Sequence, residues 1–447
     1  MLPFFRNSKR LTVCVLLTLS IQFEWGNLSA QSYYFPPLTG TSWDTVSVSA
    51  LGWCQPELDS LIDYVGQRNS KAFILLKNGK IVSEHYYGTF TRDSLWYWAS
   101  AGKSLTACLA GIAQQEGLLS IQNPTTQYIG SGWTSCTPTQ EQAITVRNQL
   151  TMTSGLDDGV TDPYCTDDTC LQFLTAAGTR WAYHNAPYTL LDSVLESATG
   201  VSLNTYNASR LKSRTGMDGF YFQSGYNNLY LSTPRSMARF GSLILNRGEW
   251  DGTPVLSDTS YFRQMTTTSQ SFNQSYGYLW WLNGKSSFMA PGLQWIFPGS
   301  WSPNAPADMI AALGKNGQMI NVVPSQNLVW IRMGEDPTGN DVPFSFNDTI
   351  WQYINRVQCT ATSVEVMKPE VTLSIYPNPA IDQVTIDMQD QIRGVAELVD
   401  VTGRLISTQE VDNTSFSIDL KGVPKGLYVI LLRAVNGNNL SGKLLVE

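Results

Sequence analysis

Histidine is nearly absent from this sequence. Only His85 and His184 occur among 447 residues, and no Cys-x-x-Cys pair is present. Zinc sites are built from histidine and cysteine at short spacings, so no metal centre is expected, and no cofactor is predicted. The sequence also lacks a Gly-x-Ser-x-Gly segment, which excludes the nucleophile elbow that a conventional Ser–His pair with His184 would need.

Charged residues are scarce as well. They make up 15% of the chain, and the formal net charge is −7. An acidic chain with no basic cluster beyond its first ten residues is not expected to bind nucleic acid. The hydrophobic content of 43% is that of a globular protein, and the length allows two or three domains.

No hydrophobic run is long enough to span a bilayer, but a short one lies near the N-terminus. Arg6, Lys9 and Arg10 precede the apolar residues 11–21, and the small residues Ser29 and Ala30 follow. This order is that of a secretion signal cleaved near Ala30. We therefore expect residues 1–30 to be a signal peptide and the mature chain to have no transmembrane segment.

Six cysteines remain after residue 30: Cys54, Cys108, Cys136, Cys165, Cys170 and Cys359. An even number in an exported chain indicates disulfides. Cys165 and Cys170 enclose a short polar loop and are the favoured pair. Cys54 with Cys359 would join the ends of the main domain, which would leave Cys108 with Cys136. Other pairings stay open.

The hydrophobic pattern predicts helices and strands in an uneven order. Helical spacing covers residues 58–65, 100–115, 188–200 and 232–246, short helices alternate with loops over 120–180, and strands are expected at 72–76, 80–83, 276–282, 309–313, 318–323 and 327–333. The turn Asn78-Gly79 indicates a hairpin. Helices followed by strands, with a last segment at 347–357, favour an α+β core with an antiparallel sheet and an inserted helical region.

The composition changes after residue 360. Residues 361–372 are polar and mixed and are expected to be a linker. Beyond them, short strands at 384–387, 396–399, 415–418 and 428–431 alternate with turn residues, which predicts a small all-β sandwich over 373–447. That part has neither cysteine nor histidine, so chemistry is expected in residues 31–360.

Ser100 and Lys103 form a Ser-x-x-Lys pair at the start of a predicted helix. Side chains three residues apart lie on one helix face, where a neutral lysine can take the proton of the serine hydroxyl. The pair has a duplicate at Ser209 and Lys212, so the motif alone decides little.

Companion motifs select between the two pairs. A serine–lysine enzyme needs a further proton carrier, often tyrosine in Tyr-x-Asn, and a polar Lys-x-Gly strand beside the pocket. Tyr-x-Asn begins at Tyr183, Tyr226 and Tyr353, and Lys-x-Gly begins at Lys77 and Lys315. Lys77 is expected at a hairpin end. Ser100, Tyr183 and Lys315 give the order nucleophile, tyrosine, lysine strand with wide spacings. After Ser209 the tyrosine would be Tyr226, at the edge of a turn, or Tyr353, beyond Lys315, and neither has a comparable setting.

Residues 70–357 resemble the serine β-lactamase and penicillin-recognising hydrolases, on the class C side. The matching segments are Ser100–Lys103, Leu150–Leu156, Trp181–Asn185, Tyr188–Leu191, Ser232–Gly241, Tyr276–Trp281 and Gly314–Gln318. The Trp280-Trp281 pair and the Gly-x-x-Gly-Gln ending are nearest the 6-aminohexanoate-dimer hydrolase and esterase branch. His184 stands where the family usually has serine, and Asn316 where it often has threonine.

The resemblance implies an α+β fold, a β-lactamase-like antiparallel sheet with helices on both faces. It also implies roles: Ser100 as nucleophile, Lys103 as base and Tyr183 as proton carrier. The N–H groups of Ser100 and Gln318 would bind the oxyanion. The supporting and substrate-binding residues would be Asn185, Lys315, Gly317, Gln318 and Trp281. Asp157 and Asp158 are expected in a solvated loop.

Three functions follow from these residues. The leading one is an exported serine hydrolase of small amide or ester substrates. The alternatives are a β-lactamase or D-Ala-D-Ala peptidase acting on cell-wall-type substrates, and a catalytically silent penicillin-binding-like recognition module.

The last domain resembles the C-terminal sorting domain of type IX secretion cargo. The resemblance rests on Tyr376–Ala380, Val399–Arg404, Gly426–Val429 and Lys443–Glu447. It implies the type IX secretion machinery as a partner. It also implies export through the periplasm to a secreted or surface-attached state.

Overall fold

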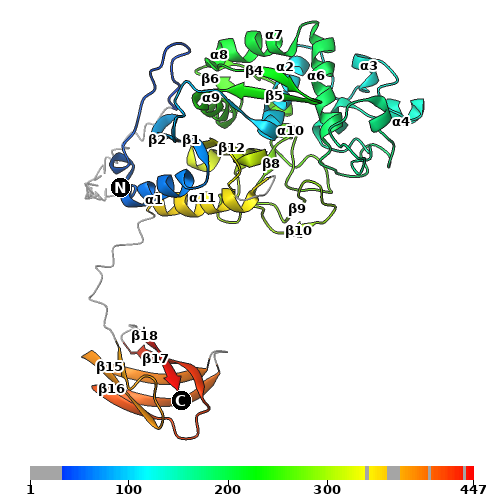
Figure 1. Cartoon of the computed structure of the whole chain (residues 1–447). Helices are drawn as coiled ribbons and strands as arrows, with labels where there is room; N and C mark the ends of the chain where they lie inside the picture. The colour runs from blue at the N-terminus through cyan, green and yellow to red at the C-terminus, as the bar shows by residue number, and fades with distance from the viewer. Residues whose placement is uncertain (1–32, 338–341, 360–372, 401–403, 436–438) are drawn as a thin grey trace, which may run out of the picture. The chain divides into compact units, whose positions relative to one another are not determined.

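The chain is described here from a computed structural model that covers residues 33–337, 342–359, 373–400, 404–435 and 439–447. It divides into two compact units, Met1–Cys359 and Thr360–Glu447 (Figure 1). The predicted signal peptide, 1–30, and the predicted linker, 361–372, lie outside the described residues.

The larger unit is built on a six-stranded antiparallel sheet. Its strands are β1 (Ser70–Lys77), β2 (Lys80–Tyr86), β8 (Trp281–Leu282), β11 (Ile310–Gly314), β12 (Gln318–Val323) and β13 (Leu328–Gly334), in the order β2-β1-β13-β12-β11-β8. The β1–β2 hairpin turns at Asn78 and Gly79, whose positive φ angles of 51° and 80° suit the predicted asparagine–glycine turn. Pairing of β1 with β13 brings the two ends of the unit together.

Helices cover both faces of this sheet, as predicted (Figure 1). One face carries α1 (Gln55–Gly66) and α11 (Phe344–Val357), where Trp351 Nε1 donates to Asn321 Oδ1 of β12 at 3.0 Å. The other face carries α2 (Gly102–Gln115) and α9 (Pro234–Leu245). In α9, a Cβ on Gly241 would come within 2.5 Å of Val329 in β13, so glycine allows this close approach.

A helical region with a small sheet is inserted between β2 and α9. Its elements are β3 (Trp96–Tyr97), η2 (Ala99–Ala101), α2, α3 (Thr126–Ile129), α4 (Pro138–Gln142), α5 (Val146–Leu150), η3 (Asp168–Cys170), α6 (Asn185–Thr199), α7 (Leu203–Asn207), the π-helical η4 (Ala208–Lys212), α8 (Ser213–Thr215), β4 (Phe220–Ser224) and β5 (Asn227–Ser232). Strands β3, β5 and β4 form one sheet in that order. Helix α6 ends at Gly200, as the sequence predicts, because this glycine has the left-handed φ of 71°.

The remaining short elements connect these parts. They are η1 (Ser49–Leu51), β6 (Glu249–Trp250), β7 (Thr253–Pro254), α10 (Thr259–Met265), β9 (Ser287–Phe288), β10 (Phe297–Pro298), η5 (Lys315–Gly317) and η6 (Pro324–Gln326).

The predicted strand at 276–282 is wrong over most of its length, since only Trp281 and Leu282 are extended in the sheet. The backbone turns at Leu279, whose φ is 58°. Tyr278 N donates to Met265 O and Leu279 N to Leu150 O, both at 3.1 Å. These backbone bonds to two helix ends replace the ladder of a longer strand.

Two disulfides form and one predicted pair does not. Cys54–Cys359 and Cys165–Cys170 are bonded, which confirms both predictions. The prediction for Cys108 and Cys136 is wrong, because both are free cysteines. Cys108 is fully buried within α2, whereas Cys136 lies in the loop before α4 with its Sγ against Leu171 O.

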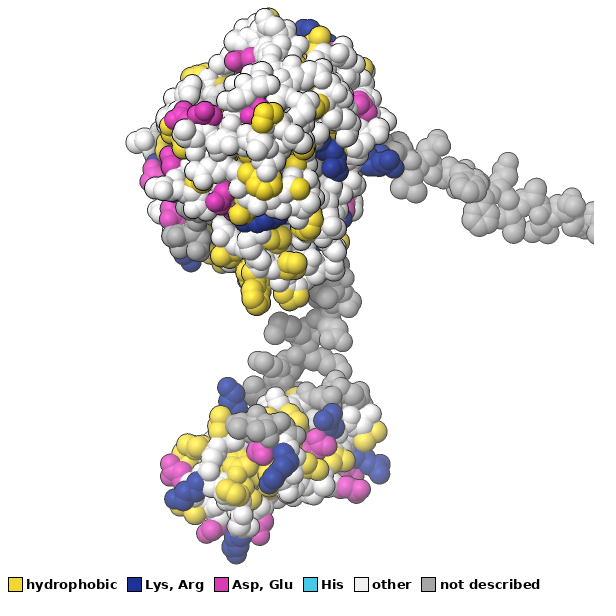
Figure 2. Space-filling view, turned by 90° about the vertical axis from the view of Figure 1, so that its right-hand side faces the viewer, with side chains coloured by type: hydrophobic (Ala, Val, Ile, Leu, Met, Phe, Trp, Pro, Cys, Tyr) yellow, Lys and Arg dark blue, Asp and Glu magenta, His cyan; other side chains and the backbone are white. Residues whose placement is uncertain are grey.

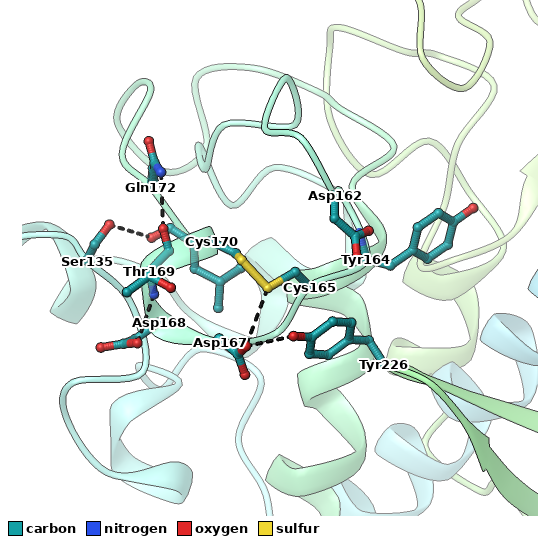
Figure 3. The surroundings of a disulfide bond; sticks show 11 residues. Ser135, Asp162, Tyr164, Cys165, Asp167, Asp168, Thr169, Cys170, Gln172 and Tyr226 are labelled. Carbon is teal, nitrogen blue, oxygen red and sulfur yellow. Dashed lines mark hydrogen bonds between the residues drawn. A yellow bond between two sulfur atoms is a disulfide. The ribbon is translucent and has the colours of Figure 1, made fainter.

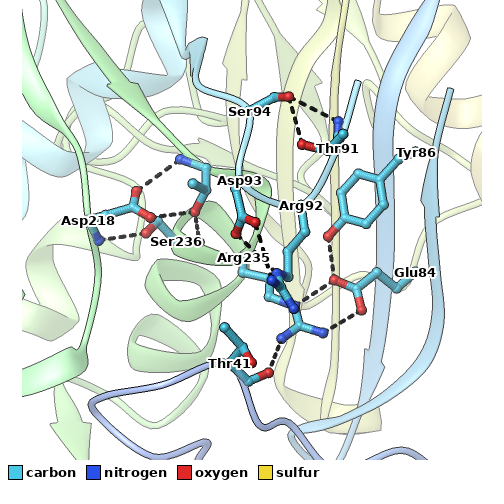
Figure 4. A network of polar contacts seen from close by, with 11 residues as sticks. Thr41, Glu84, Tyr86, Thr91, Arg92, Asp93, Ser94, Asp218, Arg235 and Ser236 are labelled. Atoms are coloured by element: carbon cyan, nitrogen blue, oxygen red, sulfur yellow. Dashed lines mark hydrogen bonds and ion pairs between the residues drawn. The ribbon is translucent and has the colours of Figure 1, made fainter. Parts of the chain in front are cut away.

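Residues 33–43 form an irregular arm that is held by two arginines of α9. Arg235 donates to both carboxylate oxygens of Glu84 on β2, at 2.6 and 2.7 Å, and to Thr41 O of the arm (Figure 4). Arg239 donates to Pro37 O at 2.7 Å. The arm is thereby fixed to both the sheet and its covering helix.

The smaller unit is all-β, as predicted. Its strands are β14 (Ser374–Tyr376), β15 (Gln383–Asp400), β16 (Leu405–Asp419), β17 (Gly426–Ala434) and β18 (Asn439–Val446). They lie in the order β14-β15-β17-β18, with β16 also paired to β15. The strands predicted at 384–387 and 396–399 belong to one long β15 whose register shifts between Asp387 and Ile392.

Candidate active site

Ser100 lies in η2, two residues before α2 begins at Gly102. The residue before it, Ala99, has a φ of 47°, a left-handed conformation that a non-glycine residue adopts only where its surroundings impose it. Trp98 N donates to Tyr230 O at 2.8 Å and fixes the entry to this turn. The N–H groups of a first helical turn have no partner within the helix, so that of Ser100 is available to a ligand.

Lys103 follows Ser100 by one helical turn and meets it. Its Nζ donates to Ser100 Oγ at 3.0 Å and lies 4.2 Å from the ring centroid of Tyr188. The side chain is buried, and burial lowers the pKa of Lys103 to about 7, while the neighbouring Asp192 opposes this shift. Near neutral pH a large fraction of this amine is therefore uncharged, which a base requires.

Tyr183 completes the cluster from the segment just before α6. Burial raises its pKa, and a hydrogen bond with Ser100 partly offsets that rise, so the phenol keeps its proton at neutral pH. Its ring stacks on Trp281 with centroids 6.0 Å apart and planes at 19°. Trp281, predicted to bind substrate, is buried behind Tyr183 and supports that ring.

A cleft with two lobes opens at Ser100. The larger lobe has a volume of about 590 Å³ and the smaller about 330 Å³. Ser100, Tyr164 and Lys315 line both lobes. The larger lobe also contains Tyr183, Asn185, Pro291, Pro343 and Phe344, and the smaller contains Lys103, Tyr188, Thr189, Asn227 and Asn228. The predicted residues Ser100, Lys103, Tyr183, Asn185 and Lys315 thus meet in one cleft.

The end of β11 lies against the backbone of Ser100. A Cβ on Gly314 would lie 2.5 Å from Trp98 O and 3.0 Å from Ser100 N, so no larger residue fits there without a shift. The next residue, Lys315, reaches the cleft. The strand edge beside Ser100 therefore ends at Gly314, and Lys315 begins the turn that follows it.

Gly317 and Gln318, both predicted to support the site, lie off the cleft lining. Gln318 is fully buried, and its Nε2 donates to Gly334 O at 2.6 Å. Gly317 has a φ of 71° and packs against Arg332, whose Nη1 donates to Gly317 O at 3.0 Å. These contacts fix the turn that carries Lys315.

The Cys165–Cys170 disulfide closes a loop at the cleft (Figure 3). Tyr164, next to Cys165, lines both lobes. Tyr226 OH donates to Asp167 Oδ2 at 2.7 Å and ties this loop to the β4–β5 hairpin. Tyr226, one of the three Tyr-x-Asn tyrosines, is thereby occupied outside the cleft.

Asp158 and His184 are two titratable residues near Tyr183, and the prediction for Asp158 is wrong. Asp158, expected in a solvated loop, lines the larger lobe and pairs with Arg180 Nη1 at 2.6 Å. His184 is buried, and its ring nitrogens have no hydrogen-bond partner within the described part of the chain. Burial lowers the pKa of His184 to about 4, so its ring is neutral at pH 7.

The duplicate motifs lie elsewhere. Ser209 Oγ donates to Tyr206 O, and Lys212 Nζ donates to Gly219 O, so this second pair binds backbone. Lys77 Nζ donates to Gln326 O at the end of its hairpin, and Tyr353 stacks on Tyr64. None of them lines the cleft around Ser100.

Asp192 is a site residue that sequence reasoning missed. It follows Tyr188 by four residues on α6, so both lie on the helix face that meets Lys103. Burial raises the pKa of Asp192 to about 7, and Asn228 Nδ2 donates to its Oδ2 at 3.0 Å. The sequence did contain one sign of its role: Asp192 is a carboxylate on the apolar face of the helix predicted at 188–200.

Replacing Asp192 by asparagine is expected to change the pH dependence of turnover. A carboxylate near Lys103 favours its ammonium form, so removing it lowers the lysine pKa further. The acidic limb of kcat/KM against pH should move to lower pH by about one unit, the lower end of what a neighbouring charge produces. Steady-state rates from pH 5 to 9 measure this shift.

Glu196→Gln is the matched control for Asp192→Asn. It removes one negative charge from the same helix at an exposed position, and the amide oxygen can still accept from Leu203 N. In Glu196→Gln the acidic limb of kcat/KM against pH should stay at the wild-type pH. An unmoved limb in Asp192→Asn, or an equal shift in both variants, would contradict the influence of Asp192 on Lys103.

The described residues contain no group of three or more His, Cys, Asp or Glu side chains placed to hold an ion.

A separate hollow of about 650 Å³, with Arg247, Arg263 and Phe262 in its wall, shares no lining residue with the cleft at Ser100.

Comparison with known proteins gives the family. The Beta-lactamase family model matches residues 58–345. An uncharacterized protein of Alkalihalophilus pseudofirmus is 24% identical over 300 residues, which cover 58% of this chain and 81% of that protein.

Solved structures give the same fold. A putative 6-aminohexanoate-dimer hydrolase from Bacillus anthracis matches with a TM-score of 0.54 at 18% identity, covering 72% of this chain and 89% of its own. A putative β-lactamase from Bacteroides dorei matches with a TM-score of 0.55 at 18% identity, covering 68% of this chain and 99% of its own. At such identities the likeness establishes the fold alone.

The smaller unit has its own match. The Secretion system C-terminal sorting domain family covers residues 374–447, and this domain implies a secreted or cell-surface protein. In the described ranges, no helix combines the length and apolarity needed to cross a bilayer.

Proposed function

The chain belongs to the β-lactamase family, and on that premise we propose that it is an exported serine hydrolase that cleaves small amide or ester bonds. The reaction would pass through an acyl-enzyme on Ser100. One observation carries this proposal: the buried amine of Lys103 lies 3.0 Å from Ser100 Oγ, and burial lowers its pKa to about 7. A serine hydroxyl is a weak nucleophile until such a base accepts its proton.

Acylation begins with Ser100 Oγ attacking the substrate carbonyl carbon while its proton passes to neutral Lys103. The negative charge that develops on the carbonyl oxygen needs two N–H donors. We assign them to Ser100, at the start of its helix, and to Lys315, because Gly314 approaches Ser100 N at the end of β11 and Lys315, the next residue, lines the cleft. In this proposal the N–H group of Lys315 takes the place of the Gln318 N–H group, which the sequence suggested as the second oxyanion donor.

The leaving group then departs with a proton from Tyr183, which Lys103 replenishes. Tyr183 suits this step because its raised pKa keeps the phenol protonated and because it is hydrogen-bonded to Ser100. In deacylation, water attacks the acyl carbon and gives its proton to the same pair, and Ser100 Oγ recovers a proton as the carboxylate product leaves. Asn185 would hydrogen-bond the substrate from the cleft wall.

The substrate class is tested with three compounds on one preparation of the full chain: p-nitrophenyl butyrate, 6-aminohexanoate dimer and nitrocefin. We expect turnover of the ester or the linear amide to exceed that of nitrocefin by at least about tenfold in kcat/KM. Hydrolysis of nitrocefin faster than that of both other compounds would instead support the β-lactamase alternative. A silent recognition module would turn over none of the three.

Export is proposed from the smaller unit and the N-terminal sequence together. The signal peptide would take the chain to the periplasm, and the sorting domain would then engage the type IX secretion machinery. The small-molecule substrate would accordingly be met outside the cell or at its surface.

A further inference from the structure

Three large apolar side chains stand exposed beside the cleft. Leu293, Trp295 and Ile296 are 48%, 68% and 56% exposed, and we call them the apolar rim. They lie in the connection between β9 and β10, and residues 289–298 contain no charged side chain. Figure 2 shows hydrophobic side chains gathered at the lower edge of the larger unit, the edge where Figure 1 places β9 and β10. Exposed clusters of this kind mark binding surfaces.

The apolar rim continues the wall of the cleft. Ala290, Pro291 and Gly292 line the larger lobe, and Leu293 follows them directly in the chain. Pro343 and Phe344 form apolar parts of the same lobe. A ligand that extends out of this lobe along that wall therefore passes onto the rim.

Contacts to the site hold the rim in place. Phe288 of β9 stacks on Phe297 of β10 with centroids 5.2 Å apart, and its edge meets Phe344 at 5.9 Å. Gln294 Nε2 donates to Trp181 O at 3.2 Å, two residues before Tyr183. A surface fixed in this way loses little conformational entropy when it binds a ligand.

We propose that the apolar rim binds the aliphatic acyl chain of the substrate where it leaves the cleft, which makes esters or amides of medium-chain carboxylic acids the preferred class. This inference rests on the proposed function. The uncharged rim and the apolar wall of the larger lobe suit a hydrocarbon chain. The smaller lobe, with Thr189, Asn227 and Asn228, offers hydrogen bonds to a polar leaving group.

The test compares p-nitrophenyl acetate, butyrate and octanoate, all below their aggregation concentrations, on the full chain. The octanoate should exceed the acetate about tenfold in kcat/KM, because part of each added methylene leaves water on the rim. Trp295→Ser should lower kcat/KM for octanoate about tenfold and leave acetate within about twofold.

Leu118→Ser is the matched control. Leu118 is 41% exposed and follows the far end of α2, which is 14 residues and thus about 20 Å long. This variant should keep the chain-length preference. A flat wild-type series, or equal loss of acetate and octanoate turnover in Trp295→Ser, would overturn the rim proposal.

The outcomes separate this proposal from the function it rests on. Absence of any ester turnover would remove the hydrolase itself, whereas turnover without chain-length preference would remove only the role of the rim. A rim that instead joins two copies of the chain, or binds lipid vesicles, would show Trp295-dependent sedimentation with an unchanged chain-length series, and that result would also overturn it.

Discussion

Replacing Ser100 by alanine is expected to reduce turnover by about four orders of magnitude or more, because members of one catalytic unit fail together. The alanine variant keeps the cleft and the base but has no oxygen to carry the acyl group. The fold should be unaffected, since Ser100 lies at the cleft surface and not in the core. Initial rates on p-nitrophenyl butyrate, with circular dichroism for the fold, measure this.

The chain supplies its own control for this substitution. Ser209 stands in the same Ser-x-x-Lys spacing but donates to Tyr206 O outside the cleft. Ser209→Ala should keep wild-type rates within about twofold, as surface substitutions usually do. If Ser100→Ala retained more than a tenth of the activity, or Ser209→Ala lost it, the assignment of the nucleophile would be wrong.

Replacing Lys103 by methionine is expected to lower kcat by about a thousandfold, within the range that general base catalysis contributes. Methionine fills nearly the same volume but accepts no proton. Lys103→Arg should fail as well, because a guanidinium stays protonated at every working pH. In the wild type, the rate should rise with pH through about 7 as the Lys103 ammonium loses its proton.

Stability separates a loss of chemistry from a loss of fold in these variants. Burial destabilises the ammonium form of Lys103 more than Asp192 stabilises it, and methionine removes that cost. Lys103→Met should therefore unfold at the same temperature as the wild type or higher, while Lys212→Met should keep full activity. A Lys103→Met variant that is unstable, or that follows the wild-type pH profile, would contradict the role as base.

The contact between Ser100 and Lys103, the proposed nucleophile and base, could be predicted from sequence because it is local. Ser100 and Lys103 meet across one helical turn, and the helix at 100–115 follows from its own apolar stripe. Tyr183 was found from its order along the chain. Its place in the cleft depends on Trp281, which the chain brings from about a hundred residues away.

The sequence alone could not place the residues at the strand edge beside Ser100. Gln318 was expected to be the oxyanion donor and Lys315 to lie in a polar segment beside the pocket. In the structure Gln318 is buried off the cleft lining, and Lys315 begins the turn 315–317 between β11 and β12. Which residue of a hairpin faces a neighbouring helix depends on its register and turn geometry. The close approach of Gly314 to Ser100 N appears only once both elements are placed.

The partners of buried polar residues also could not be predicted from the sequence. Asp192 and Arg332 have sequence neighbours that give no sign of their partners, Asn228 and the Gly317 carbonyl. The same holds for Cys108, which α2 buries away from Cys136. By contrast, the hairpin at Asn78 and Gly79 and the short Cys165–Cys170 loop were predicted because both are closed within a few residues.

The most direct test of the acyl-enzyme on Ser100 is labelling with a fluorophosphonate followed by intact mass and peptide mapping. A single adduct is expected on Ser100 in the wild type and in Ser209→Ala, with none in Ser100→Ala and slow labelling in Lys103→Met. An unlabelled wild-type protein, or an adduct of equal yield in Ser100→Ala, would contradict it.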